Sequence, residues 1–420
     1  MSTDITPANN EPVVPANNEP VVQVPSNSPP PHKKISRRKV FALAGTGAFV
    51  LVVGGGVWRA ADQGVFSTGE GPAYEPWDDW RTTTRGPLDL VRAAILAANP
   101  HNSQPWLFHV TQTQIDLFAD YRRNLGTVDP FLREMHIGLG CALENLLLAA
   151  TANGYITQVT FLPDAADATL VARIGLTRGN VPVSDLYPFI PQRHTNRYPY
   201  DTGRPVTSAT LDALSALGDD PDVKVFWFSS TDIRQRVGTL LLDAANAFVA
   251  DKAQDAVDTG TWWRGTWQDI QQHRDGITLD AAGLPDLTRT LGKMLPSVSV
   301  EQQDSSFLQN TANQVKTAGA FGFLTVRNGQ DRKQQLNAGR LWARMQLWAT
   351  KEGLAMQPLN QATERESREV VLGSTPHFGT SLQTLVGDPA WQTLLTFRTG
   401  YSTHEGLRSP RRAVNDVVKP

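Results

Sequence analysis

Two long helical patterns, 199 positions apart, constrain the fold of this 420-residue chain more than any other feature of its sequence. The first lies within residues 131–155 and the second within residues 336–354, and each repeats its apolar residues at helical spacing. When the two are aligned, five of the fifteen positions that begin at Gly140 and Gly339 are identical. Two helices of similar composition could agree this well by chance, but a strand-like segment also follows each one. The sequence therefore favours two related halves in one chain.

The segments around the first helix predict a mixture of helices and strands. A helical pattern ends at Asn99, because Pro100 restricts the conformation of the residue before it. Residues 107–119 are typical of two strands or a hairpin. Residues 158–163 and 168–176 are typical of single strands. We therefore predict an α+β fold.

The N-terminal region differs in composition from the rest of the chain. Residues 1–32 hold eight of the 28 prolines and repeat the octapeptide PANNEPVV, so we predict that they are disordered. Residues 33–58 place five basic residues before 19 uncharged ones, which is the order of an export signal. The pair Arg37-Arg38 resembles the twin-arginine type, which exports folded proteins. Residues 59–84 are predicted to be a linker.

Whether the export signal is cleaved stays open. No clean cleavage site follows it, and its uncharged run is nearly long enough to span the ~30 Å hydrocarbon core of a membrane. A retained anchor and a cleaved signal are equally compatible with this pattern. In either case we expect the protein to be periplasmic or anchored to the outer face of the cytoplasmic membrane.

Charge and cysteine content exclude several classes of protein. The net charge of −2 gives the chain no general attraction to nucleic acid, so no nucleic-acid partner is expected. The single cysteine, Cys141, excludes an intrachain disulfide and a cysteine-cluster metal site. The sequence also lacks G-x-S-x-G, H-E-x-x-H and a Cys/His pair at metal-ligand spacing. We therefore expect no metal site and no triad-type catalytic cluster.

A loop rich in neutral hydrogen-bonding groups follows the first helical pattern. It contains His101, Asn102, Ser103 and Gln104, with Trp106 close behind. Uncharged donors and acceptors beside a large ring suit a polyol or the edge of a heterocycle. The alternative is a capped turn whose tryptophan fills the core.

Two basic clusters could hold an anion. The segment RHTNR brings Arg193 and Arg197 together with a histidine, a threonine and an asparagine. The planar fork of arginine matches phosphate oxygens at two points. A second cluster near the C-terminus contains Arg408, Arg411 and Arg412. The alternatives are a solvated loop for the first cluster and an ordinary basic tail for the second.

Taken together, these motifs resemble the nitroreductase family. The stretch LVRAAILAANPHNSQPW resembles the flavin loop of that family, and RHTNR…RPV resembles its phosphate-binding arginine motif. The stretch FRTGYSTHEGLRSPRRAVNDVV resembles its C-terminal segment, whose basic residues also reach the phosphate. Across residues 85–418 the pattern is most similar to the Acg-like branch, whose single long chain looks like a fused nitroreductase dimer. The resemblance implies a nitroreductase-like pseudo-dimer of two tandem halves, residues 85–185 and 186–420, acting as a monomer.

The resemblance also implies one FMN site in each chain. Ordinary nitroreductases bind FMN between two subunits, whereas here the loop occurs once, in the first half, and the arginine motifs once, in the second. In the segment MQPLNQ the family often has an acidic residue and a glycine, where this chain has leucine and asparagine. The implied cofactor-binding residues are His101, Asn102, Ser103, Gln104, Arg193, His194, Thr195, Asn196, Gln357, Pro358, Leu359, Asn360, and Arg411 or Arg412.

These implications lead to two main hypotheses for function. The first is an FMN-dependent oxidoreductase that reduces small electron-poor compounds, nitroaromatics or quinones, through flavin N5 and needs no catalytic side chain. The second is an FMN storage or sequestration protein with a covered flavin, no turnover with NAD(P)H and no substrate. An insertion at about residues 255–310, rich in tryptophan, could be the cover, although such tryptophans usually pack an added helix onto the core. A weaker third option is a scaffold that has lost its cofactor. Apart from a small-molecule substrate, the one partner expected is the membrane, through an uncleaved N-terminal segment.

Overall fold

The computed structural model of the chain describes residues 55–81, 86–295 and 298–420. The predicted disordered region, residues 1–32, lies outside the described residues, and so do residues 33–54 of the predicted export signal. Residues 82–85, at the predicted boundary between linker and first half, lie outside them as well. The expectations for these regions stay predictions.

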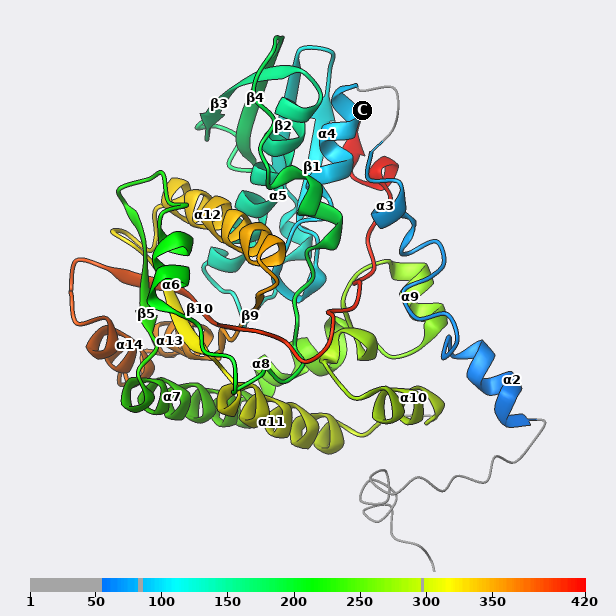
Figure 1. Cartoon of the computed structure of the whole chain (residues 1–420), viewed down its shortest axis with the longest axis vertical. Coiled ribbons are helices and arrows are strands. Elements are labelled where there is room, and N and C mark those ends of the chain that lie inside the picture. The colour runs from blue at the N-terminus through cyan, green and yellow to red at the C-terminus, as the bar shows by residue number, and fades with distance from the viewer. Residues whose placement is uncertain (1–54, 82–85, 296–297) are drawn as a thin grey trace, which may run out of the picture. The chain divides into compact units, whose positions relative to one another are not determined.

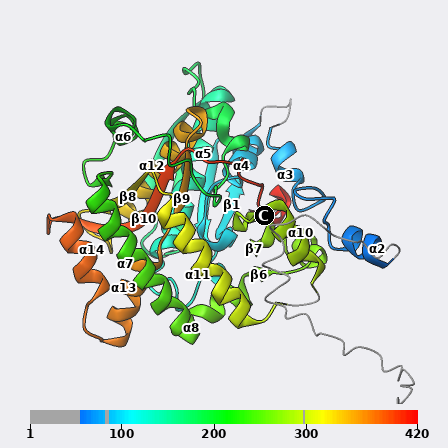
Figure 2. The ribbon, with the colours of Figure 1, turned by 60° about the horizontal axis from the view of Figure 1, so that its bottom comes forward.

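The two central helices form where the sequence predicts them and pack tightly against each other. They are α5 (Arg133–Ala152) and α12 (Arg332–Lys351) (Figures 1 and 2). A Cβ atom on Gly140 would lie 2.1 Å from the carbonyl oxygen of Leu336. One on Gly339 would lie equally close to a backbone oxygen of α5. The two helix backbones therefore touch at these glycines, where any side chain would push them apart.

Contacts between the two helices follow the offset of 199 residues seen in the sequence. Gly140 faces Gly339 across the helix pair. One helical turn earlier, Nδ1 of His136 lies 2.6 Å from Oε1 of Gln335, which is 199 residues further along the chain. Residues related by the offset therefore meet each other, as equivalent residues do at a two-fold axis. This geometry supports the interpretation of two related halves.

Each half contributes one sheet, with two strands before its central helix and two after it. The first sheet has the order β11-β1-β2-β4-β3 and contains the predicted hairpin and both predicted single strands. The second has the order β5-β8-β10-β9 and is antiparallel throughout. The fold is therefore α+β, built of two tandem halves. The strands are β1 (Trp106–Val110), β2 (Gln114–Ala119), β3 (Tyr155–Phe161), β4 (Leu170–Arg178), β5 (Val223–Phe228), β8 (Ala320–Val326), β9 (Ala355–Pro358), β10 (Gln392–Gly400) and β11 (Val418–Lys419).

Further helices cover the two sheets and bury two apolar cores. The larger core joins both halves around α5 and α12, and a smaller one lies between the second sheet and the helices α7, α13 and α14 (Figures 1 and 2). Among the other described helices, α4 packs against α5, α11 packs against α7, and α9 and α10 lie in the predicted insertion. The helix bounds are α2 (Gly55–Asp62), α3 (Glu75–Asp78), α4 (Pro87–Ala94), α6 (Ser208–Ser215), α7 (Thr231–Ala250), α8 (Lys252–Ala256), α9 (Trp267–His273), α10 (Asp286–Met294), α11 (Val300–Lys316), α13 (Gln361–Leu372) and α14 (Phe378–Val386).

The C-terminal segment leaves the second half and completes the first sheet. Strand β11 pairs in parallel with β1, with Phe108 opposite Val418. The predicted boundary assigns residues 186–420 to the second half, but in the structure residues 418–419 form a strand of the first sheet. The difference arises because backbone groups at the edge of the first sheet find hydrogen-bond partners in the last residues of the chain.

The predicted linker, residues 59–84, is packed onto the protein over its described part. The side chains of Tyr74 and Trp77 are only 1% and 2% exposed. Nε of Arg59 donates a hydrogen bond of 2.8 Å to the carbonyl oxygen of Met294 in the insertion. The linker prediction is wrong for residues 59–81 because it gave too little weight to the aromatic side chains, whose apolar area favours burial.

The predicted insertion, residues 255–310, carries short helices and a two-stranded sheet, β6 (Trp263–Arg264) and β7 (Ile277–Thr278). Trp262 is 5% exposed and packs in a small apolar cluster with Phe248. Trp267 packs against the main core. These two tryptophans therefore attach the insertion to the body of the protein, and its role as a cover stays a prediction.

Candidate functional site

The predicted neutral loop has a strained backbone. His101, Asn102 and Gln104 have φ angles of 49°, 53° and 52°, in the left-handed region that residues other than glycine rarely adopt. Side chains hold this path: Oδ1 of Asn99 accepts a hydrogen bond of 2.7 Å from the backbone of Gln104. Nδ2 of Asn102 donates one of 2.9 Å to the carbonyl oxygen of Pro410. Strain of this kind persists only where the surrounding structure enforces it, and it gathers at binding sites.

The amide of Gln104 connects three distant parts of the chain. Its side chain is fully buried, and Nε2 donates a hydrogen bond of 2.8 Å to the carbonyl oxygen of Arg274 in the insertion. Its Oε1 accepts one of 2.8 Å from the backbone of Arg412 in the C-terminal segment. Close by, Ser103 is buried with no hydrogen-bond partner for its hydroxyl among the described residues. Trp106 is also fully buried, so its ring belongs to the core.

Arg193 and Arg411 lie side by side in the interior. They are 4% and 2% exposed, and both donate to the carbonyl oxygen of Leu96, at 3.0 Å and 3.4 Å. Arg411 also donates to Oδ1 of Asn102 in the strained loop. In the part of the chain that the structure describes, neither arginine is paired with a carboxylate. The structure thus brings a residue of the second half, one of the C-terminal segment and the first-half loop together at one place.

Three guanidinium nitrogens of this pair have no acceptor among the described residues. They are Nε and Nη1 of Arg193 and Nε of Arg411. Burial lowers the pKa of Arg193 to about 10. Burial and the charge of Arg193 lower the pKa of Arg411 well below its ordinary value. Two buried like charges with unused donors are costly for a folded protein, and a bound anion would offset that cost.

Aromatic rings form one wall beside these arginines. The ring centroids of His194 and Trp77 are 4.8 Å apart in an edge-to-face arrangement. The guanidinium carbon of Arg411 lies 4.8 Å from the centroid of the Trp77 ring. Burial and the two nearby arginines lower the pKa of His194 to about 3, so its ring is neutral at neutral pH. No motif in the sequence pointed to Trp77, because it lies in the segment predicted to be a linker.

Other residues of the two basic clusters serve structural contacts. Asn196 is buried, donates to the carbonyl oxygen of His404 at 2.7 Å and accepts from the hydroxyl of Ser402 at 3.0 Å. Thr195, between His194 and Asn196 in the chain, is half-buried. Arg412 directs its guanidinium to the carbonyl oxygens of Gln104 and Asp416. Of the two C-terminal candidates, Arg411 is therefore the one beside Arg193.

The segment Gln357 to Asn360 is built into the second sheet. The buried amide of Gln357 lies between Arg398, which donates to it at 2.7 Å, and Gln314, to which it donates at 2.9 Å. Leu359 belongs to the smaller apolar core, and Oδ1 of Asn360 accepts from the backbone of Thr396 at 3.1 Å. Pro358 ends β9. For these four residues, the side-chain partners named here all belong to the second half.

A second buried cluster of ionisable groups lies behind the loop. His101 pairs with Asp258 of the insertion. Burial lowers the pKa of His101, but the Asp258 carboxylate outweighs it, and the pKa is raised overall. Burial and the neighbouring Asp129 raise the pKa of Glu134 to about 7, and burial and Glu134 raise the pKa of Glu364 well above its ordinary value. No sequence pattern predicted this cluster, because its members lie on separate helices and loops that are distant in the chain.

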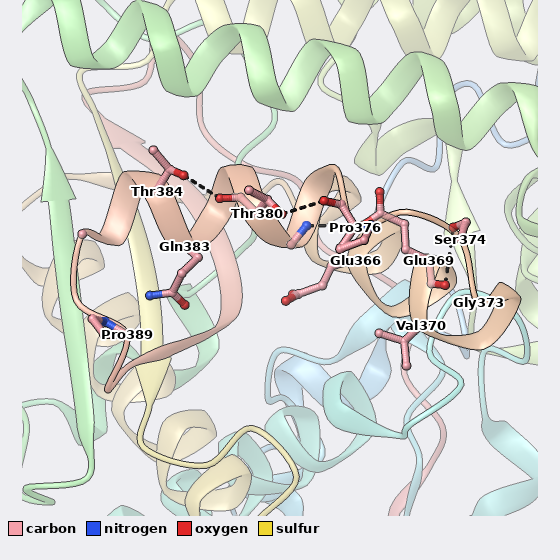
Figure 3. Close-up of a pocket in the computed structure, with 12 residues that line it drawn as sticks. Glu366, Glu369, Val370, Gly373, Ser374, Pro376, Thr380, Gln383, Thr384 and Pro389 are labelled. Carbon is pink, nitrogen blue, oxygen red and sulfur yellow. Dashed lines mark hydrogen bonds between the residues drawn. The ribbon is translucent and has the colours of Figure 1, made fainter.

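A surface groove between α13 and α14 is separate from these clusters (Figure 3). It has a volume of about 830 Å³, and Glu366, Glu369 and Thr380 are among the residues that line it. None of the predicted site residues lines it. Glu369 is engaged, since its carboxylate accepts hydrogen bonds from three backbone N–H groups at the start of α14. The groove is therefore not the candidate site.

Known proteins with sequences similar to this chain include proteins named as nitroreductases. No family model matches the chain. The chain is 24% identical over 349 residues to "Putative NAD(P)H nitroreductase acg" of Mycobacterium tuberculosis, which covers 81% of this chain and 97% of that protein. The chain resembles Acg-type nitroreductases. "Putative NAD(P)H nitroreductase Rv3131" of the same organism is 24% identical over 280 residues, covering 66% of this chain and 76% of that protein.

Solved structures give more distant similarities. An FMN-dependent nitroreductase, NfnB from Mycobacterium smegmatis in complex with NADPH, is 15% identical, with a TM-score of 0.37 over 57% of this chain and 99% of that one. A putative nitroreductase from Anabaena variabilis is 12% identical, with a TM-score of 0.40 over 69% of each chain.

Proposed function

We propose that the protein binds FMN, with the phosphate held by Arg193 and Arg411, and works as a nitroreductase-like oxidoreductase. The observation that carries the proposal is the buried pair of guanidinium groups with three unused donors and no carboxylate among the described residues. A phosphate dianion offers the charge and the acceptor oxygens that this pair lacks. The similarity to Acg along 97% of that protein's length supports the same assignment.

The residues fit the two ends of FMN unequally. The phosphate end fits, because charged donors converge there and the neutral ring of His194 adds no further charge. At the flavin end, Asn102 and Gln104 already bind other parts of the protein, and Gln357 to Asn360 belong to the second sheet. When bound, FMN supplies the electron transfer, and the protein supplies binding and orientation. We propose small electron-poor compounds, nitroaromatics or quinones, as the substrates.

Storage or sequestration of FMN is the second candidate function. The burial of Arg193 and Arg411 favours it, because a phosphate held by side chains that are 4% and 2% exposed would exchange slowly. The predicted export favours it too, since NAD(P)H would be scarce outside the cytosol. We propose that residues 33–58 direct the folded protein, already loaded with FMN made in the cytosol, through the twin-arginine route. Periplasmic and membrane-anchored forms both agree with this proposal.

Purification of the unaltered protein and of arginine variants tests the proposal. We expect a yellow protein that releases FMN on denaturation. Arg193→Ala removes charge-assisted hydrogen bonds worth ~1.5–3 kcal/mol and should weaken FMN binding by about tenfold to a hundredfold. Arg408→Ala is the matched control, because Arg408 pairs with Asp78 at the surface and its side chain is 37% exposed. A colourless unaltered protein, or equal affinity in both variants and the unaltered protein, would refute the proposal.

Reduction experiments separate the two candidate functions. Under anaerobic conditions a reductase should lose its yellow colour on addition of NADPH and regain it with a quinone. A storage protein should stay yellow with NADPH and bleach only with a strong chemical reductant such as dithionite. Bleaching by NADPH would therefore exclude storage without turnover.

A further inference from the structure

The side chain of Tyr74 places a hydroxyl deep inside the protein. Tyr74 lies in the segment before α3 and is 1% exposed, yet its hydroxyl has no hydrogen-bond partner among the described residues. A buried hydroxyl without a partner costs free energy, so native structures rarely contain one unless a ligand or an ordered water completes it. The position of this hydroxyl therefore needs an explanation.

The segment that carries Tyr74 is hydrogen-bonded to the segment that carries Arg411. The carbonyl oxygen of Ala73 accepts a hydrogen bond of 2.7 Å from the backbone of Arg411. Nε1 of Trp77 donates one of 2.8 Å to the carbonyl oxygen of Ser409. Figure 1 shows the same relation, with the blue α3 beside the red C-terminal segment. Tyr74 thus lies between two residues, Ala73 and Trp77, that bond to the segment carrying Arg411.

Electrostatics keep the Tyr74 hydroxyl protonated next to this positive charge. Burial and Asp280 raise its pKa, and Arg411 lowers it by a smaller amount, so that the pKa is raised overall. The hydroxyl therefore stays a donor throughout the physiological pH range. Asp280 itself is engaged by Lys293, whose Nζ lies 2.8 Å from its carboxylate.

We propose that Tyr74 donates its hydroxyl hydrogen to the same phosphate that Arg193 and Arg411 hold, an inference that rests on the proposed FMN binding. The residues before the first half then contribute a third segment to the phosphate site, beside the segments of Arg193 and Arg411. Four buried donors without a partner among the described residues lie on the three segments that meet here: Oη of Tyr74, Nε and Nη1 of Arg193, and Nε of Arg411. A phosphate monoester offers three terminal oxygens to such a set.

This arrangement selects for the phosphorylated flavin. Riboflavin, which has no phosphate, would leave all four donors unpartnered, whereas FMN satisfies them. The contribution of Tyr74 is therefore specific to FMN. Removal of its hydroxyl should weaken FMN binding and leave riboflavin binding nearly unchanged.

Titrations of the flavin-free full-length protein with FMN and with riboflavin test the inference. For Tyr74→Phe we expect about a tenfold weaker affinity for FMN and a change of less than about twofold for riboflavin. Tyr121→Phe is the matched control, because its hydroxyl bonds to the carbonyl oxygen of Ala168 at the surface of the first half. Circular dichroism and urea unfolding check that both variants are folded. The ³¹P resonance of bound FMN should move in Tyr74→Phe and stay in place in Tyr121→Phe.

The outcomes distinguish this inference from the proposed function. If Arg193→Ala weakens FMN binding but folded Tyr74→Phe binds both flavins like the unaltered protein, the phosphate site stands and the role of Tyr74 is refuted. The role of Tyr74 is also refuted if Tyr74→Phe weakens the binding of FMN and of riboflavin equally. That result is expected if the hydroxyl served only the packing around Asp280. If the unaltered protein binds no FMN, or Arg193→Ala has no effect, the proposed function fails and this inference fails with it.

Discussion

The glycine contact between α5 and α12 makes a strong prediction about stability. In Gly140→Ala the new methyl carbon would lie 2.1 Å from the carbonyl oxygen of Leu336, about 1.3 Å inside the 3.4 Å at which ordinary contact begins. The obstructing atom belongs to the backbone and cannot rotate away, so the helices must separate. Forcing atoms into a packed core costs ~1–3 kcal/mol or more, and the helix preference of alanine over glycine returns ~1 kcal/mol. Because the obstruction is backbone, the upper end of this cost applies, and we expect a net loss of about 2 kcal/mol.

Urea unfolding followed by circular dichroism measures this loss. Gly175→Ala in β4 is the matched control, because the nearest atom to its new methyl carbon, a backbone oxygen of Gln158, is 3.8 Å away. Adding Gly339→Ala to Gly140→Ala should cost less than Gly339→Ala alone, since both residues share one contact that is already open. If Gly140→Ala unfolds at the same urea concentration as the control, the helices do not touch at this point. The inference of a two-fold contact between the halves would then be wrong.

Two further predictions concern the loop and the ionisable cluster behind it. Trp106→Ala should lower the free energy of unfolding by ~3–5 kcal/mol, because the ring is fully buried; a loss below 1 kcal/mol in urea unfolding would place it outside the core. Glu134 has a pKa of about 7 in the folded protein and a lower one when unfolded, so the folded state holds an extra proton between these values. The contribution of Glu134 to stability should therefore fall by about 3 kcal/mol as the pH rises from 4.5 to 7, and Glu134→Gln should remove this contribution in urea titrations across this range. An unchanged slope in Glu134→Gln would assign the effect to other groups.

Local patterns in the sequence predicted the elements that depend on local properties. The spacing of apolar residues predicted α5, α12 and the hairpin of β1 and β2, and the shared glycines pointed to related halves. The residue types in RHTNR and SPRR pointed to an anion, and Arg193 and Arg411 do lie side by side. Patterns of this kind can be read without knowing which distant segments meet.

Features that depend on long-range contacts could not be predicted from local sequence patterns. The residues around Tyr74 and Trp77 look like a linker until the C-terminal segment provides a surface on which to bury them. The pairing of Glu134 with Glu364 joins two helices more than 200 residues apart in the chain. For Leu359, the family resemblance implied a cofactor contact, whereas the structure packs its side chain into the apolar core with residues of α7 and α13, because burial favours a leucine side chain.

The pairing of β11 with β1 has a consequence for biosynthesis. The last strand of the chain lies beside the first strand of its first sheet, and Arg411 enters the interior with the same C-terminal segment. While the ribosome still holds these residues, the first sheet lacks its edge strand and the arginine pair lacks one member. An anion can therefore be held between Arg193 and Arg411 only after residues 411–419 have been synthesised and have left the ribosome.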